Sequence, residues 1–349
     1  MNGFGYTLKE YEFFIGEQSN EKHLIVEGKT DKTFFKILLD EYSQTMKTMN
    51  NKIIEEINID DIETMIQKND EFKLLITGVV GNRRKIESIH KNIQKSSKYK
   101  NLVFFIDREF DDFSISLNQE IQDYIGKHKV DGSMIWSRGH SIENYLFDFS
   151  ILRNPLKELS DIELFNEAIK LFENNFYQII KLATAISITL KECKRIKELE
   201  EIIDWELICL ENKNSITINI DDLQKRICER KKLSLEESKK IIDIYQQWLN
   251  KIDQENVDID ILRWLCHGHI GTRIILEAYR TCINYSFTSK NPTKTINQDI
   301  DKKANKKIRK NGQEEIWEKI VNWWADKAIR NECLYPSEVL QKLCLISNS

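Results

Sequence analysis

An apolar run that changes abruptly to acidic residues is the feature of this sequence that most constrains its fold. The run LVFFI at 102–106 is followed directly by Asp107, Glu109 and Asp111, within DREFDD. Five consecutive apolar residues without polar alternation are typical of a strand buried on both faces. Carboxylates at the end of such a strand are costly unless water, a partner or a cation compensates them. The sequence therefore predicts a buried strand that ends in a polar site.

Two other acidic residues follow short apolar stretches in the same way. Glu27 ends the run LIV in HLIVEGKTD, and Glu143 lies in HSIENYLF, shortly after MIW. Between the apolar stretches lie helical patterns, one capped by Thr30 and one with a basic face at 82–98. This alternation predicts an α/β fold with a parallel sheet flanked by helices, whose strands lie at 23–27, 72–76, 102–106 and 134–136. In such sheets the functional groups gather at the carboxyl ends of the strands.

The length of 349 residues favours two domains, and the pattern changes near residue 155. We expect residues 1–154 to form the catalytic α/β domain. Residues 155–349 are mainly helical and would serve in substrate selection, dimerisation or partner docking. The helical patterns cover 161–202, 221–251, 257–284 and 313–345, and the polar, Lys-rich stretch 286–312 is predicted to be a loop or linker.

Composition indicates a soluble, cytoplasmic protein without a membrane association. Charged residues make up 31% of the chain, and no apolar run approaches the roughly 20 residues that span a bilayer. The first residues lack the basic start and apolar core of a secretion signal. Seven cysteines without a Cys-x-x-Cys pair are expected to be reduced and mostly packed. The net charge of −4 does not by itself indicate a nucleic-acid-binding protein.

The acidic residues predict a site for a hard divalent cation, Mg²⁺ or Mn²⁺. In an extended segment Asp107, Glu109 and Asp111 would point to one side and would repel one another without a cation. Glu27 is a candidate metal ligand or general acid/base, and Glu143 is a further candidate ligand. The alternatives are a solvated acidic turn after the strand, a carboxylate favoured by a helix N-terminus at Glu27, and a capped helix start at Glu143.

A glycine-punctuated stretch, TGVVGNRRK at 77–85, is a second candidate for substrate contact. Gly78 and Gly81 would allow backbone amides to approach a phosphate, although the Walker spacing is absent. A plain helix start is the alternative. The residues expected to contact substrate phosphates are Lys29, Arg83, Arg84 and Lys85.

The stretch WLCHGHIG offers Cys266, His267 and His269 near one another. Without a fourth nearby ligand these residues are more typical of a helix end or core than of a zinc site. A role near the active site is the competing hypothesis.

The order of these motifs resembles the Toprim domain of topoisomerases, bacterial primases and nucleases of the overcoming-lysogenization-defect type. Glu27 and Gly28 follow a strand, a glycine lies in the next strand–helix turn, and Asp107 and Glu109 follow the apolar quintet. More narrowly, VEGKTDKTFF, FFIDREFDDF and SIENYLF resemble the AriB-like family, which includes the Toprim nuclease effector of the PARIS anti-phage system. The resemblance covers about residues 20–150, and the helical remainder only loosely.

The resemblance implies Mg²⁺-dependent cleavage of phosphodiesters, with Glu27 as the Toprim glutamate and Asp107 and Glu109 as the metal-binding pair. It also implies a homodimer, an ATPase sensor partner, and RNA, with tRNA a candidate, as the favoured nucleic acid substrate of a toxic effector. Many Toprim domains have aspartate where this chain has Glu109. Two alternatives stay open at this point: a flavodoxin-like receiver phosphorylated on Asp107, and a non-catalytic Toprim-derived regulatory or nucleic-acid-binding module.

Overall fold

The computed structural model describes residues 22–50, 57–158, 162–195, 202–203, 205–211, 213, 215–290 and 312–346. The first 21 residues, and positions 291–311 of the predicted Lys-rich linker, lie outside the described residues. The chain forms two compact units, and each unit combines stretches that are distant in sequence. Unit 1 comprises Met1–Arg108, Ile125–Ile142 and Ala325–Ser349, and unit 2 comprises Glu109–Tyr124 and Glu143–Trp324.

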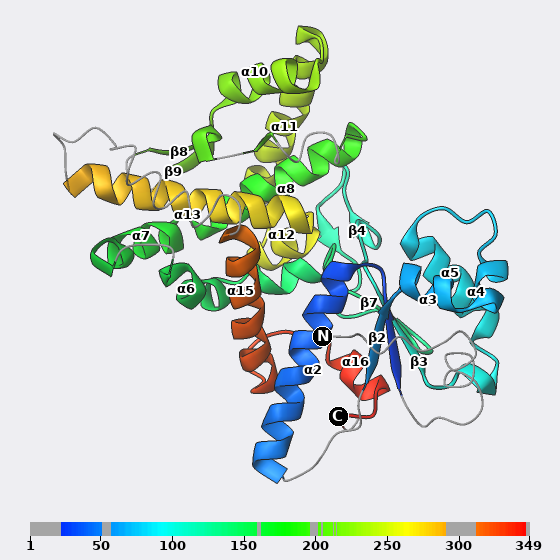
Figure 1. Ribbon diagram of the computed structural model, residues 1–349. Helices are drawn as coiled ribbons and strands as arrows, with labels where there is room; N and C mark the ends of the chain where they lie inside the picture. Colours follow the sequence, from blue (N-terminus) through cyan, green and yellow to red (C-terminus); the bar gives the residue numbers. More distant parts are fainter. Residues whose placement is uncertain are drawn as a thin grey trace. The chain divides into compact units, whose positions relative to one another are not determined.

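Unit 1 is built on a five-stranded sheet with the strand order β2-β1-β3-β7-β6 (Figure 1). Its strands are β1 (His23–Val26), β2 (Asn58–Asp61), β3 (Leu102–Ile106), β6 (Val130–Asp131) and β7 (Met134–Trp136). The first three and β7 run parallel, while β6 pairs antiparallel with β7. Every residue of β1, β3 and β7 is buried, which explains why these strands lack polar alternation. The predicted α/β fold with a mainly parallel sheet is confirmed.

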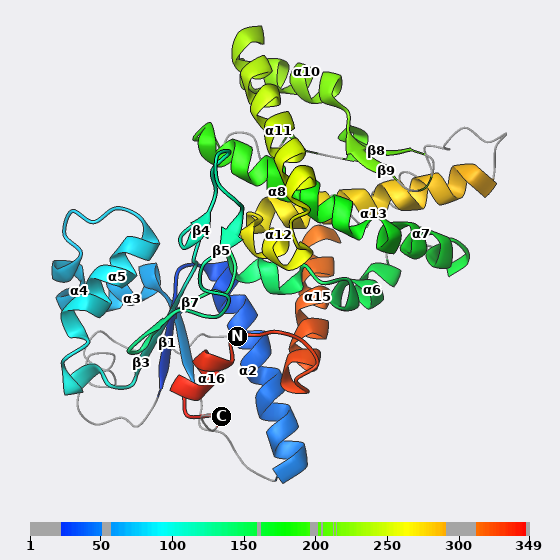
Figure 2. The same ribbon diagram turned by 180° about the vertical axis from the view of Figure 1, so that it is seen from behind.

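Helices cover both faces of this sheet (Figure 2). On one face lie α3 (Ile62–Lys68), α4 (Asp70–Leu75) and α5 (Asn82–Ile93), which share an apolar core with alternate residues of β3 and β7. On the other face Phe35 of α2 (Lys29–Asn50) meets Phe105 of β3, with ring centroids 4.8 Å apart at 71°. Neighbouring strand residues point to opposite faces, so β3 contributes to both layers.

The C-terminal segment packs onto unit 1. Helix α16 (Ser337–Lys342) contacts β3 and buries Val339 and Leu340 completely. The Tyr42 hydroxyl of α2 donates a hydrogen bond of 2.5 Å to the Leu345 carbonyl. His128 Nδ1 and Glu338 Oε2 lie 2.9 Å apart.

At acidic pH we expect α16 to loosen, because the ionised form of Glu338 makes the contact with His128. Burial alone would raise the pKa of Glu338, but the hydrogen bond and charge of His128, together with hydrogen bonds from the Glu338 amide and the Ser337 hydroxyl, outweigh it and lower that pKa below the ordinary 4.5. The stabilisation is therefore complete above about pH 4.5 and is lost as the pH falls through the lower folded-state pKa. Hydrogen exchange of residues 325–346, followed across this range, should show the loss. In Glu338→Gln the same pH dependence should be absent, and its persistence would contradict the assignment.

One strand predicted for this sheet is wrong, and two of its strands, β2 and β6, were not predicted. Residues 72–76 belong mostly to α4, because Asn69 caps a helix there by accepting a hydrogen bond from the Phe72 amide. Phe72 is the buried residue of α4, so this apolar run is not buried on two faces as a central strand would be. The edge strand beside β1 is instead β2, whose sequence NIDD ends in two carboxylates and lacks an apolar run. Asp61 ends β2 and caps α3.

Unit 2 is mainly helical, with two short antiparallel hairpins. Its helices are α6 (Phe149–Lys157), α7 (Ile162–Asn174), α8 (Phe176–Glu192), α10 (Ile220–Lys231), α11 (Leu235–Glu255), α12 (Ile259–Leu265), α13 (Gly268–Lys290) and most of α15 (Gly312–Ile329). The hairpins pair β4 (Phe113–Ser114) with β5 (Gln122–Asp123), and β8 (Ile208–Glu211) with β9 (Ser215–Ile218). The prediction of a helical C-terminal region is confirmed. No helix in the described part of the chain combines the length and apolar character that crossing a bilayer requires.

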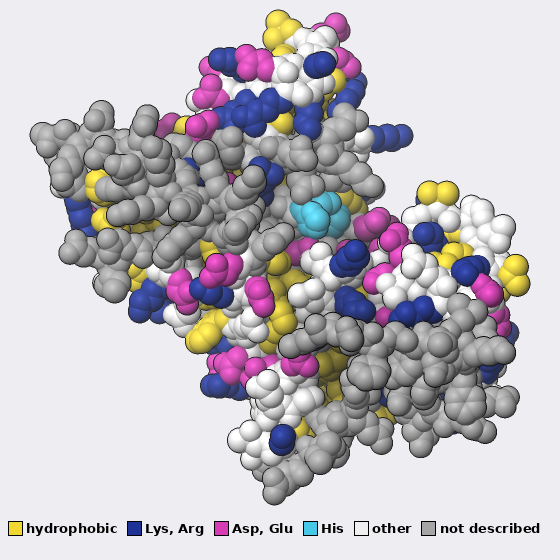
Figure 3. Space-filling model, viewed as in Figure 1, with side chains coloured by type: hydrophobic (Ala, Val, Ile, Leu, Met, Phe, Trp, Pro, Cys, Tyr) yellow, Lys and Arg dark blue, Asp and Glu magenta, His cyan; other side chains and the backbone are white. Residues whose placement is uncertain are grey.

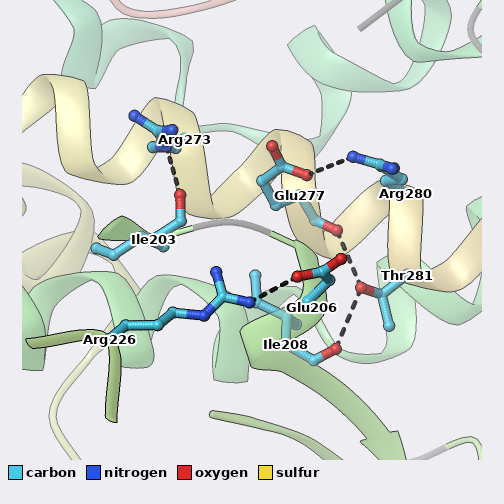
Figure 4. A network of polar contacts seen from close by, with 8 residues as sticks. All are labelled: Ile203, Glu206, Ile208, Arg226, Arg273, Glu277, Arg280 and Thr281. Atoms are coloured by element: carbon cyan, nitrogen blue, oxygen red, sulfur yellow. Dashed lines mark hydrogen bonds and ion pairs between the residues drawn. The ribbon is translucent and has the colours of Figure 1, made fainter. Parts of the chain in front are cut away.

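Helix α13 is the central element of unit 2, and it contacts α7, α8 and β8. Polar side chains fix β8 and the residues before it against α13 (Figure 4). Arg273 Nε donates a hydrogen bond of 2.5 Å to the Ile203 carbonyl. The Thr281 hydroxyl donates a hydrogen bond of 3.3 Å to the Ile208 carbonyl. These bonds give hydrogen-bond donors to a carbonyl of β8 and to a carbonyl of the segment before it.

Candidate functional site

Glu27 and Asp107 lie together at the carboxyl edge of the sheet. Glu27 follows β1 and Asp107 follows β3, and these two strands are parallel neighbours. The Asp107 amide donates a hydrogen bond of 2.8 Å to Glu27 Oε1. Both side chains are half-buried. The carboxylate of Glu27 is thus held against the backbone of Asp107 where the two strands end.

Asp31 belongs to the same turn, although it was not among the predicted site residues. Its Oδ2 accepts a hydrogen bond of 3.0 Å from the Gly28 amide, and its side chain is buried in the first turn of α2. The contact fixes the tight turn from β1 into α2 and holds Glu27 at the end of the strand. The spacing Glu27-x-x-x-Asp31 at a strand–helix junction was the available signal, since a helix favours acidic residues in its first turn.

The start of α5 is attached to both strand ends. Asn82 Nδ2 donates to the Glu27 carbonyl at 3.0 Å, and Arg83 Nη1 donates to the Arg108 carbonyl at 3.1 Å. Arg83 Nε also lies 3.1 Å from Glu87 Oε1, so this predicted substrate contact supports the site structurally.

The other three predicted phosphate contacts differ in exposure. Arg84 and Lys29 are exposed, and Lys85 is half-buried with its Nζ 3.4 Å from Asn82 Oδ1. Arg84 and Lys29 are therefore the most accessible cations of the predicted set.

Arg108 is a fully buried arginine directly after Asp107. Its amide donates to Ser137 Oγ at 3.0 Å, and its Nη1 donates to the Arg138 carbonyl at 3.0 Å. Ser137 Oγ in turn donates to the Gly139 carbonyl at 2.6 Å. This network joins the end of β3 to the turn after β7, and so holds Asp107 in place from the neighbouring strand.

Glu109 and Asp111 belong to unit 2, and the segment that carries them is not extended. Strand β3 ends at Ile106, and Glu109 has a φ of 54°, in the left-handed region. The prediction that Asp107, Glu109 and Asp111 share one side of an extended segment is therefore wrong, because the chain turns at Glu109. Both Glu109 and Asp111 are exposed.

Lys191 of α8 lies beside this acidic turn in unit 2. Its Nζ is 4.6 Å from the centroid of the Phe110 ring. Burial lowers the pKa of Lys191, while the charges of Asp111 and Glu192 act in the opposite direction. A cation next to Asp111 was not predicted, because Lys191 is one of many lysines on helical patterns and is 80 residues away.

Glu143 and His269 meet within unit 2. Glu143 Oε1 and His269 Nε2 are 3.4 Å apart, and the side chain of Glu143 is 7% exposed against 58% for His269. Asn144 fixes the facing turn, because its Nδ2 donates to the carbonyls of Arg263 and Cys266 at 2.5 and 2.8 Å. The predicted stretches HSIENYLF and WLCHGHIG are therefore brought together.

Cys266 and His267 are structural neighbours of this pair. Burial raises the pKa of the Cys266 thiol to about 12, so the thiol is a packing group at neutral pH. The His267 amide donates to Ser187 Oγ at 3.0 Å, and the rings of His267 and His269 have centroids 5.8 Å apart. All seven cysteines are free.

The described residues contain no group of three or more His, Cys, Asp or Glu side chains arranged to hold a metal ion. The donors at the sheet edge are nevertheless of the kind that Mg²⁺ takes. This ion is commonly bound through one or two carboxylates, completed by waters and substrate phosphates. The Glu27–Asp107 pair fits that partial protein contribution.

A scan against protein-family models and a search of curated proteins gave no match to this chain. Membership of a family is therefore not shown by similarity. The resemblance to the Toprim domain therefore stays a prediction from the order of the sequence motifs.

Proposed function

We propose that this protein is a Mg²⁺-dependent Toprim endonuclease that cleaves nucleic acid phosphodiesters. The observation that carries the proposal is the direct contact of Glu27 with Asp107 at the ends of adjacent parallel strands. Acidic side chains at this edge could bind a divalent cation that also binds the substrate phosphate. Apolar strands that hold them there supply the rigidity that positioning needs.

The residues have separate roles in this scheme. Asp107 and Glu27 would hold Mg²⁺, or Mn²⁺ in its place. The other predicted ligands, Glu109, Asp111 and Glu143, belong to unit 2. When bound, the cation would neutralise the scissile phosphate and activate water. Glu27 would alternatively move a proton at its carboxylate. Exposed cations at Lys29 and Arg84 would contact phosphates on either side of the scissile bond.

RNA is the favoured substrate, with tRNA a candidate, because the family that the motifs resemble contains effectors that disable translation. The same resemblance supports a cytoplasmic toxic effector in anti-phage defence, acting as a homodimer. It also supports restraint of the nuclease by an ATPase sensor. The helical unit would then supply substrate selection or partner docking.

A non-catalytic Toprim-derived binding module is the second candidate. The observation in its favour is that no described cluster offers three protein ligands to a metal. In that case Glu27 and Asp107 would serve to fix the strand ends, and nucleic acid would be bound without cleavage.

Metal-dependent cleavage tests the proposal directly. Wild-type protein should be incubated with tRNA, single-stranded RNA and duplex DNA in Mg²⁺, in Mn²⁺ and in EDTA. We expect cleavage of RNA in either metal and none in EDTA. Glu27→Ala should remove cleavage, while Asp40→Ala, an exposed carboxylate of α2 away from the strand end, should retain it.

Cleavage that continues in EDTA, or in Glu27→Ala, would contradict a metal nuclease. Tight binding of nucleic acid without cleavage in either metal would favour the binding module.

A further inference from the structure

The end of α4 and the connection from it to α5 carry the two most exposed large hydrophobic side chains in the described part of the chain. Val80 is 81% exposed and Leu74 is 76% exposed. Isolated exposed hydrophobic residues are common on protein surfaces, so exposure alone assigns no role. Here, however, Val80 lies on the connection that leads into the start of α5, and Leu74 lies in the last turn of α4 just before that connection.

This α4–α5 loop, residues 76–81, has a fixed backbone. Gly78 and Gly81 have φ angles of 79° and 91°, which other residues adopt only with strain. The Val79 amide donates to the Ile76 carbonyl at 2.8 Å, and Ser88 Oγ of α5 donates to the Leu75 carbonyl at 3.0 Å. The loop conformation therefore holds Val80 outward.

The base of the loop is attached to the candidate catalytic residues. Asn82, two residues after Val80, binds the carbonyl of Glu27, and Arg83 binds the carbonyl of Arg108. A group bound at Val80 is consequently held by the same short segment that contacts the strand ends.

Basic residues flank the loop along the chain. Arg84 is exposed on the first turn of α5, where Lys85 is half-buried with its Nζ 3.4 Å from Asn82 Oδ1, and Lys73 of α4 is exposed and pairs with Asp70 at 2.6 Å. In Figure 3, hydrophobic atoms lie next to Lys and Arg side chains over the region of α4 and α5. An exposed apolar side chain flanked by basic residues is an arrangement by which proteins insert a wedge into a base stack.

We propose that the α4–α5 loop is a nucleic-acid wedge. Val80 enters between stacked bases of a base-paired RNA stem, Leu74 covers the exposed base face, and Arg84 and Lys85 hold the flanking phosphates. The proposal rests on the proposed nuclease function and names its substrate class as stacked, structured RNA instead of free single strands. Nucleotides unstacked at the loop are then positioned beside Glu27 and Asp107.

The test uses full-length Asp107→Asn protein, which should bind substrate without cleaving it, and an RNA hairpin carrying 2-aminopurine in its stem. The fluorescence of this base increases when it leaves a stack. We expect an increase on binding, and we expect Val80→Ser to abolish it and to weaken binding about tenfold. Leu235→Ser removes a hydrophobic side chain of α11 that is 71% exposed and should change neither quantity.

Arg84→Ala provides an independent measurement of the phosphate contact. It should weaken binding of every RNA and lower the slope of log affinity against log salt by about 1. A DNA hairpin of the same sequence distinguishes the two nucleic acids, and an equal fluorescence increase with DNA would overturn the assignment to RNA.

The failures can be told apart. If wild-type protein cleaves RNA but Val80→Ser leaves fluorescence and affinity unchanged, the wedge is wrong and the nuclease stands. If the protein neither binds nor cleaves any nucleic acid, both proposals are wrong.

Discussion

Asp107→Asn is expected to lower RNA cleavage about a thousandfold, which corresponds to about 4 kcal/mol in activation free energy. Asparagine keeps the shape of the side chain but removes the charge that would hold the cation. The fold should persist, because the contact with Glu27 is made by the Asp107 backbone amide and not by its side chain. Rates with saturating Mg²⁺ and the thermal unfolding temperature, measured side by side, check both parts.

The control is Asp40→Asn, which removes the same charge from an exposed position of α2. It should cleave RNA at the wild-type rate. If Asp107→Asn were equally active, Asp107 would have no part in binding the metal, and the carboxylate pair would lose its proposed use.

Gly271→Ala is expected to destabilise unit 2 by about 3 kcal/mol, the upper part of the range for an overpacked core. A Cβ at Gly271 would lie 2.4 Å from a ring carbon of Phe147 and 2.8 Å from Cys266 Sγ. Both neighbours are buried and cannot move aside without disturbing the core. The free energy of unfolding in urea, followed by tryptophan fluorescence, measures the loss.

Ser289→Ala on the exposed end of the same helix should change this free energy by less than about 0.5 kcal/mol. A neutral Gly271→Ala would mean that α13 and the 3-10 helix η2 (Ile142–Leu146) approach less closely than described. The pair Glu143–His269 would then be less firmly positioned, because these two elements carry it.

The sheet of unit 1 could largely be predicted because its signals are local. A run of apolar residues such as LVFFI specifies a buried strand by composition alone. Once β1 and β3 are parallel neighbours, their carboxyl ends must lie at one edge, so the proximity of Glu27 and Asp107 follows from topology. Strand β2 carried no comparable signal, since only one residue of NIDD is apolar.

The geometry after Asp107 could not be predicted, because it depends on contacts across the fold. The left-handed φ of Glu109 is unusual for a glutamate and has no local sequence signature. Arg108 is buried because Ser137 and Arg138 accept its hydrogen bonds, and these lie about thirty residues away. Side chains that act through such distant partners are not identified by a motif.

The place of α16 has a consequence for synthesis of the chain. Tyr42 and the Leu345 carbonyl that it binds are separated by 303 positions. When the strands of the sheet leave the ribosome, the apolar surface that α16 will cover on β3 is still open, and it stays open until unit 2 has been made. During that interval the nascent sheet exposes an apolar surface to which chaperones or other nascent chains can bind. A shortened gene product that stopped before residue 325 would retain this vulnerability permanently.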